Sequence, residues 1–256
     1  MITGGTEQVQ VGATELHLLK GGSGPACLFL HGVEGDEGWL SFHDALCHGF
    51  SVYAPSHPGY GRTPAPEWIT SVHHQAIFYN WFLQTEALGD VTLVGVGLGG
   101  WIATEMAVMC TSRLRRLVLV NPAGLRPKRG EIADIFVMPW RKVIESGFAD
   151  FHSAPEYERL YGGGIPEYGG MREAGRTMTM RMCFRPYMYD SSLEGMLGKI
   201  DLPTLIVRGD HDTIVPAECA ERYAQSIPRA ELRILRDCGH FAHLDQPDAL
   251  AEVIGQ

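Results

Sequence analysis

Two short polar segments, each following a predicted β-strand, hold carboxylates and imidazoles that could move a proton. Asp210 and Asp212 lie in the first segment, and His240 and His243 lie in the second. A carboxylate that hydrogen-bonds an imidazole fixes its tautomer and stabilises the imidazolium, so such a pair can work as a general base. Either aspartate is a candidate acid, and either histidine is a candidate base.

A third segment has the pattern of a strand, a sharp turn and a helix. The sequence VTLVGVGLGG over 91–100 is a β-branched run that reaches closely spaced glycines and leads into a helical pattern. This is the setting of the G-x-S-x-G nucleophile elbow, whose serine attacks a carbonyl carbon. Gly97 stands where that motif has serine, so the attacking oxygen is missing.

The order of elbow, acid and histidine along the chain resembles that of the α/β-hydrolase superfamily. The resemblance spans nearly the whole chain and is strong for lid-bearing esterases, lactonases and carbon–carbon bond hydrolases. The segments that carry it are Leu30-His31-Gly32, Pro58-Gly59-Tyr60-Gly61-Arg62 and Gly239-His240-Phe241. It implies an α/β fold, with a mostly parallel central sheet, helices on both faces and an inserted helical lid.

Carried over to the matching positions, the resemblance also implies a role for particular residues. Asp212 would be the triad acid and His240 the base. The backbone N–H groups of Val33 and Leu98 would form the oxyanion hole, a function that does not depend on their side chains. The supporting residues of the oxyanion loop would be His31 and Gly32.

Glycine at position 97 is expected to keep the turn while deleting the nucleophile. The elbow residue sits at positive φ, a strain that costs most residues about 1–3 kcal/mol and that glycine avoids. No neighbour replaces the serine, because Thr92 and Thr104 lie at the wrong points of the strand and the helix.

Three hypotheses of different classes follow. The chain is an enzyme that uses Asp212 and His240 as a general base, or a non-catalytic ligand-binding protein with an abandoned triad, or an ordinary serine esterase in which Gly97 is an engineered replacement. We favour a hydrolase-type enzyme acting on a small carbonyl substrate (ester, lactone, thioester or diketone). A pure binding pocket has no need for a base together with its orienting carboxylate.

The elements that must position these residues follow from hydrophobic periodicity. It predicts an antiparallel hairpin over 8–20, strands over 26–30, 50–55, 91–96, 114–120, 204–209 and 231–235, and helices over 39–47, 71–88, 97–110, 216–227 and after 247. Strands that alternate with helices predict a parallel sheet. The candidate residues should then meet at the carboxyl ends of its strands.

The stretch between Val120 and Thr204 is far longer than the roughly 10–15 residues that a crossover connection needs. It is rich in tyrosine and methionine, which suits an apolar cover over a pocket. We predict a hydrolase core made of 1–124 and 201–256, and an inserted helical cap over 125–200.

Composition restricts the class of partner. The 256-residue chain has 30 acidic and 21 basic residues and a formal net charge of −9, which disfavours nucleic acids and anionic membranes. We therefore expect a small-molecule substrate. The first residues lack the features of a signal peptide, and no apolar run approaches the roughly 18 residues of a membrane span, so a cytoplasmic location is expected. The six cysteines show no C-x-x-C spacing and are predicted to be reduced, with neither a metal nor a cofactor bound.

Overall fold

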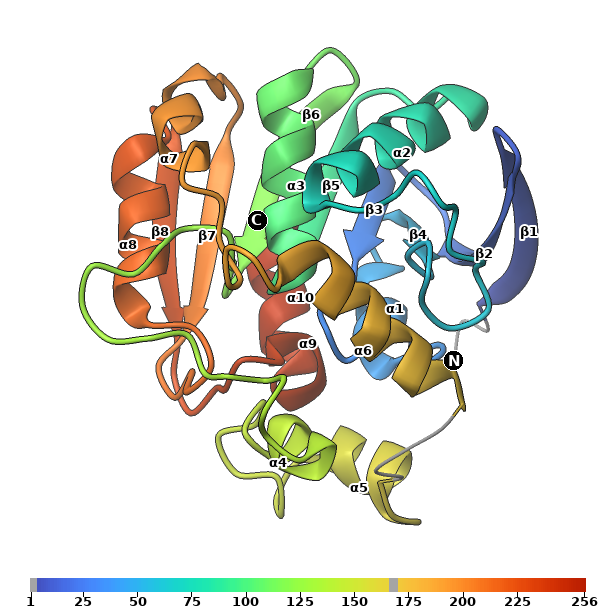
Figure 1. Ribbon diagram of the computed structural model, residues 1–256. Helices are drawn as coiled ribbons and strands as arrows, with labels where there is room; N and C mark the ends of the chain where they lie inside the picture. The colour runs from blue at the N-terminus through green and yellow to red at the C-terminus, as the bar shows by residue number, and fades with distance from the viewer. Residues whose placement is uncertain (1–3, 166–169) are drawn as a thin grey trace.

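A twisted sheet of eight strands runs through the centre of the computed structural model, which describes residues 4–165 and 170–256 (Figure 1). The strands are β1 (Gly5–Val11), β2 (Thr14–Gly22), β3 (Ala26–Leu30), β4 (Ser51–Pro55), β5 (Val91–Val96), β6 (Leu114–Val120), β7 (Thr204–Gly209) and β8 (Ala230–Leu235). Their order across the sheet is β1-β2-β4-β3-β5-β6-β7-β8. β1 and β2 pair antiparallel, as does β2 with β4, and the other neighbours are parallel. The predicted fold class and edge hairpin are confirmed.

The apolar runs predicted as central strands lie at the centre of the sheet. All six residues of β5 are buried, because β3 and β6 flank it and helices cover both faces. A strand buried on both faces has no polar side, which explains the unbroken apolar sequence.

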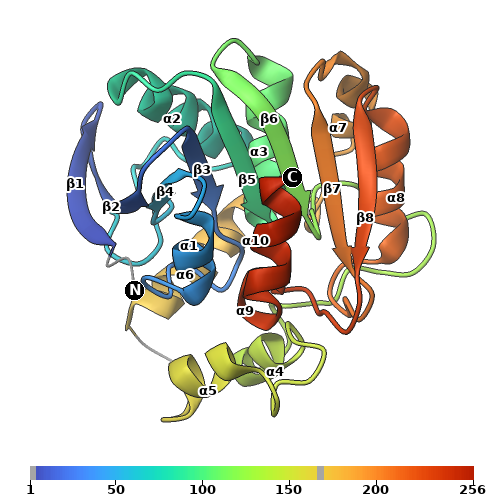
Figure 2. The same ribbon diagram turned by 180° about the vertical axis from the view of Figure 1, so that it is seen from behind.

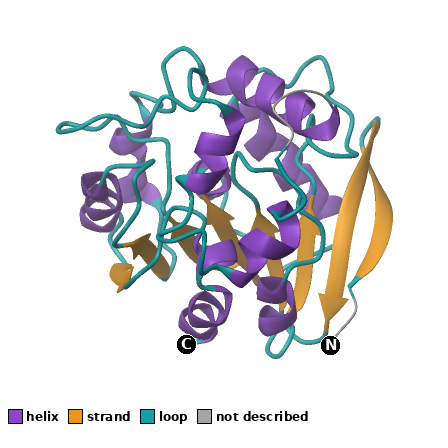
Figure 3. Cartoon of the chain, turned by 90° about the horizontal axis from the view of Figure 1, so that it is seen from below, coloured by secondary structure: helices purple, strands orange, loops and turns teal. Residues whose placement is uncertain are grey.

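Helices cover both faces of the sheet, as Figures 1 and 2 show from opposite sides. One face carries α2 (Val72–Thr85), α3 (Leu98–Met109) and α8 (Ala217–Ser226), and the other carries α1 (Ser41–Leu46) and α10 (Pro247–Gly255). Seen from below, the strands form a layer between these helices (Figure 3). The short α9 (Ala242–Asp245) precedes α10 and was not predicted from the sequence.

Between β6 and β7 the chain leaves the sheet and forms a series of helices. They are α4 (Trp140–Glu145), α5 (Pro155–Tyr161), α6 (Gly170–Cys183), α7 (Leu193–Met196) and the 3₁₀ helix η1 (Leu197–Lys199). Both views place α4 and α5 beyond the carboxyl ends of the strands (Figures 1 and 2). The range predicted for the cap, 125–200, includes residues 166–169, which lie outside the described part of the chain.

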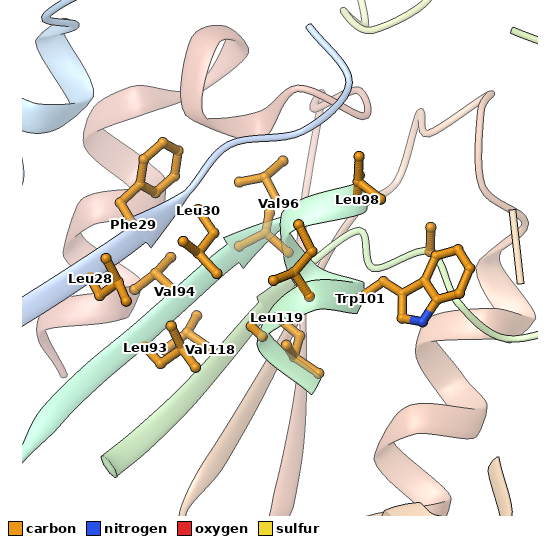
Figure 4. Close-up of a cluster of buried hydrophobic side chains, with 14 of the residues drawn as sticks. Leu28, Phe29, Leu30, Leu93, Val94, Val96, Leu98, Trp101, Val118 and Leu119 are labelled. Atoms are coloured by element: carbon orange, nitrogen blue, oxygen red, sulfur yellow. The ribbon is translucent and has the colours of Figure 1, made fainter. Parts of the chain in front are cut away.

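A cluster of buried apolar side chains lies where β3, β5 and β6 meet α3 (Figure 4). Leu28, Val94 and Leu119 are completely buried there, and Trp101 of α3 is 4% exposed. α3 approaches the sheet so closely that a Cβ on Gly99 would collide with the backbone oxygens of Leu30 and His31. In the described ranges, no helix is both long and apolar enough to cross a membrane.

Candidate active site

The turn between β5 and α3 has the backbone of a nucleophile elbow. Gly97 lies at φ 52° and ψ −110°, in a region that side-chain-bearing residues rarely adopt. Its N–H donates to Val120 O at 2.9 Å, and its carbonyl oxygen accepts the N–H groups of Trp101 and Ala123. These hydrogen bonds join the elbow to β6 and to the first turn of α3. The strained turn is therefore retained, although its residue carries no side chain.

The predicted contact between Asp212 and His240 is present. His240 Nδ1 donates to Asp212 Oδ2 at 2.8 Å, and the two side chains are 4% and 2% exposed. The second oxygen, Oδ1, accepts the N–H groups of Ile214 and Val215 at 2.8 and 3.0 Å. With its proton on Nδ1, the neutral imidazole leaves Nε2 free to accept another.

That Nε2 atom lies against the elbow. A Cβ added to Gly97 would be 2.8 Å from His240 Nε2, closer than non-bonded carbon and nitrogen atoms approach. Burial would lower the pKa of His240, but the charge of Asp212, its hydrogen bond and the charge of Glu34 together raise it above the ordinary value. The imidazole thus occupies part of the space of the missing side chain, and its basicity is increased.

The competing candidates lie elsewhere. Asp210 Oδ1 pairs with His211 Nδ1 at 2.8 Å and accepts the N–H of Cys238. His243 Nε2 is 3.3 Å from Glu34 Oε1, and both of these side chains are buried. Of the two aspartates and two histidines left open by the sequence, only Asp212 and His240 meet each other beside Gly97.

Hydrogen bonds of two histidines hold the loop that follows β3. His31 Nε2 accepts the N–H of His57, so His31 Nδ1 carries the proton and donates to Gly32 O at 2.8 Å. His57 Nε2 in turn donates to His31 O at 2.9 Å. Burial lowers the pKa of His31 and outweighs the raising effect of Glu34, so the ring is neutral. This arrangement fits a structural role for His31.

The amides expected to form the oxyanion hole are not used by the protein. Within 4–165 and 170–256, neither Val33 N–H nor Leu98 N–H donates a hydrogen bond to a protein acceptor. Leu98 is the first residue of α3, where a helical N–H has no intrahelical partner. Its N–H also lies at the positive end of the helix dipole. The oxyanion-hole role of both amides stays a prediction.

Sequence reasoning missed two buried polar residues of this region, Asn121 and Glu34. Asn121 Nδ2 donates to the carbonyl oxygens of Gly239 and His240 at 3.0 and 2.9 Å, and its Oδ1 accepts Gly209 N–H at 2.9 Å. It therefore joins the end of β6 to the end of β7 and to the segment that carries His240. Its only sequence signal was a polar residue directly after a strand.

The inserted segment contacts the loops that surround the elbow. Tyr60 Oη and Thr179 Oγ1 of α6 are 2.5 Å apart. Glu37 accepts hydrogen bonds from Tyr161 Oη at 2.9 Å and from Arg172 at 3.0 Å, so α5 and α6 are both connected to the loop after β3. Burial raises the pKa of Glu37 despite the charge of Arg172. These contacts attach the inserted helices to the loops after β3 and β4, and the covering role of the insertion stays a prediction.

A metal-binding site is not found in the part of the chain that the structure describes. No group of three or more His, Cys, Asp or Glu side chains is arranged there to hold a metal ion. The cysteines are free thiols, and all but Cys110 are buried.

Comparison with known proteins points to one family. The sequence model of the alpha/beta hydrolase family matches residues 27–253. The pimeloyl-[acyl-carrier protein] methyl ester esterase of Aromatoleum aromaticum is 26% identical over 253 residues, with 90% of this chain and 96% of the esterase aligned. The 2-hydroxy-6-oxo-6-(2'-aminophenyl)hexa-2,4-dienoic acid hydrolase of Metapseudomonas resinovorans is 24% identical over 260 residues, with 95% and 87% aligned.

Solved structures agree on the architecture. The 2-hydroxy-6-oxo-6-phenylhexa-2,4-dienoate hydrolase of a Rhodococcus strain superposes with a TM-score of 0.81 at 21% identity. The match covers 99% of this chain and 98% of that one. At this identity the likeness supports the fold alone.

Proposed function

Because the chain belongs to the alpha/beta hydrolase family, we propose that it is a hydrolase-type enzyme that cleaves a small carbonyl substrate with a general base and no serine nucleophile. One observation carries the proposal. The buried Asp212–His240 pair is intact, and His240 Nε2 lies 2.8 Å from where the Cβ of an elbow residue would be. A histidine with a proton acceptor nitrogen at this point is suited to activate a water molecule.

The reaction begins with a proton transfer. His240 Nε2 takes a proton from water while the water oxygen bonds to the substrate carbonyl carbon, and the carbonyl π electrons move to the carbonyl oxygen. Asp212 stabilises the imidazolium through its hydrogen bond to Nδ1. The amides of Val33 and Leu98 donate to the oxyanion. When the oxyanion collapses, the bond to the leaving group breaks, and the imidazolium returns its proton to the leaving group.

The substrate class follows from what the relatives have in common. One is named as a methyl ester esterase and the other as the hydrolase of an oxo-dienoic acid, so both names refer to a molecule with a reactive carbonyl group. Esters, lactones, thioesters and diketones share this group. We assign the chain to this class without choosing among its members.

Restoring the nucleophile tests whether Asp212, His240 and the amides of Val33 and Leu98 can still support acyl transfer. Gly97→Ser is expected to raise hydrolysis of a small activated aryl ester steeply, since loss of a serine nucleophile costs about 10⁶-fold in a serine hydrolase. The serine needs a small withdrawal of the His240 ring from its present position. A product burst and covalent labelling by a serine-directed phosphonate report the acyl-transfer chemistry.

Gly97→Ala is the matched control, because it adds the same Cβ to the same strained backbone and no hydroxyl group. It should fold and stay unlabelled. A folded Gly97→Ser protein with no rate gain and no labelling would mean that the base and the amides no longer form a hydrolytic site. The non-catalytic binding hypothesis would then be preferred.

A further inference from the structure

A four-residue segment of the insertion lies against the chain that carries the base and its carboxylate. This segment, 146–149, follows α4, which lies below α9 in both views of the molecule (Figures 1 and 2). Gly147 O accepts the N–H of Phe241 at 2.7 Å, and Ser146 O accepts a hydrogen bond from Thr213 Oγ1 at 3.1 Å. Phe241 and Thr213 directly follow the two members of the catalytic pair in the sequence. The insertion is therefore bonded beside both of them.

The two backbones approach so closely that glycine is needed on each side. A Cβ on Gly239 would lie 2.5 Å from Gly147 O and 2.8 Å from Ala149 N. A Cβ on Gly147 would collide with the ring of Phe241. Only a residue without a side chain permits such an approach, so both segments are adapted to this contact.

Asp245, the last residue of α9, joins the same two segments through its side chain. Its Oδ2 accepts the N–H of Gly239 at 2.7 Å and the N–H of Ala149 at 2.9 Å, and the residue is 9% exposed. A carboxylate binds a backbone N–H more strongly than a neutral oxygen does. One oxygen atom thus connects the insertion to the residue directly before His240. Asp245 has no role in the mechanism above.

We propose that Asp245 is a positioning residue, which fixes the backbone of the base to segment 146–149 and so holds the His240 ring against the elbow. This inference rests on the proposed function. His240 works as the base only while Nδ1 stays on Asp212 and Nε2 stays beside Gly97. A misplacement of about 1 Å can cost about 10²-fold in rate. In this way the insertion contributes to catalysis by fixing the base.

Asp245→Ala and Asp245→Asn separate the hydrogen bonds of this side chain from its charge. Asparagine keeps an oxygen that can accept both N–H groups, alanine has none, and neither is charged. With the activated aryl ester, kcat should fall by up to about 10²-fold in Asp245→Ala, while KM changes little. Asp245→Asn should recover most of the lost rate. Equal losses in the two variants would mean that the charge is what matters, and would overturn the proposal.

A spectroscopic signal reports the position of the base without a substrate. The Nδ1 proton of His240 gives a ¹H NMR signal while its bond to Asp212 slows exchange with water, and its absence from His240→Ala assigns it. We expect the signal to broaden or disappear in Asp245→Ala and to persist in Asp245→Asn. A loss of stability alone would leave it unchanged in the folded molecules. An unchanged signal in a folded Asp245→Ala protein would contradict the proposal.

Glu218→Ala is the matched control. Glu218 is also 9% exposed, and its Oε1 accepts the N–H of Arg129 at 2.5 Å, so it attaches another part of the insertion to α8. This variant should keep the native kcat and the native Nδ1 signal of His240. If a folded Asp245→Ala protein loses no more than this control does, the proposal is wrong.

Amide hydrogen exchange in the native protein covers a folding failure of Asp245→Ala. Because one oxygen holds both N–H groups, those of Gly239 and Ala149 should be protected and should exchange at similar rates, in one opening event. Exchange of Ala149 N–H at the rate of an unprotected amide would overturn the proposal. Neither NMR measurement needs a substrate. A failure of the proposed function is therefore seen separately, as unchanged ester hydrolysis in His240→Ala.

Discussion

At Gly97 the chain keeps the backbone angles of a strained elbow and gives up the side chain that normally uses them. The imidazole of His240 lies against the vacated position, with Nε2 only 2.8 Å from where a Cβ would stand. Glycine is needed for this approach, because any other residue would push the ring away. Glycine at position 97 therefore lets His240 Nε2 lie closer to the elbow backbone than a serine would permit.

The raised pKa of His240 predicts the pH dependence of activity. The neutral ring is the base, so kcat/KM should rise with pH through a pKa above the ordinary histidine value of about 6.5. Asp212→Asn removes the charge and the hydrogen bond that raise this pKa. We expect its acid limb at lower pH and its maximal rate lower by up to about 10⁴-fold.

Rates measured between pH 5 and 9 for both proteins check this expectation. An acid limb at the same pH in both would contradict the assignment of Asp212 as the partner that raises the pKa of His240.

At the scale of elements, the sequence predicted the bounds of elements whose apolar pattern is long, and it missed elements that are too short to show a pattern. β5 and α3 were placed within a residue of their observed bounds, because a fully apolar strand followed by a long apolar helix leaves little ambiguity. α9 was missed, since its four residues are too few to show a helical period. Periodicity alone did not separate Asp210 from Asp212, because both follow β7. The resemblance to the α/β-hydrolases selected Asp212, and Asp212 is the one that reaches His240.

The contact of Glu37 with Tyr161 and Arg172 should control how firmly the inserted helices hold to the core. Arg172→Ala leaves Glu37 buried without its cation, so the insertion over 125–200 should be cleaved faster in limited proteolysis. Arg159→Ala is the control, because Arg159 pairs with Glu156 inside the same helix, α5. Equal cleavage rates for the native protein and Arg172→Ala would argue against a role for this contact in holding the inserted helices to the core.

At the scale of the whole molecule, the parallel sheet gathers segments that are far apart in the sequence. The ends of β3, β5, β6 and β7 bring Val33, Gly97, Asn121 and Asp212 to one edge of the sheet, where the chain before α9 adds His240. The sequence predicted this edge from the alternation of strands and helices. It did not predict Asn121 or Glu34 as part of it, because each looked like an ordinary loop residue until its buried partners were known.

Asn121→Ala tests the connection between these strands. The change removes three buried hydrogen bonds and places alanine at φ 46°, so the free energy of unfolding should fall by about 2–4 kcal/mol. Urea denaturation measures the loss. Asn80→Ala, which removes only a weak contact with Met109 Sδ, should cost less than about 1 kcal/mol. Similar losses in the two variants would mean that Asn121 does not hold the strand ends together.

The most direct test of the general-base claim compares the native protein with His240→Ala at one pH near neutrality, on the same activated aryl ester. General-base catalysis contributes about 10²–10⁴-fold, so His240→Ala should lose a rate factor in that range while its NMR spectrum stays that of a folded protein. Neither protein should be labelled by a serine-directed phosphonate, because neither has a serine at position 97. Equal rates in the two folded proteins would contradict the assignment of His240 as the catalytic base.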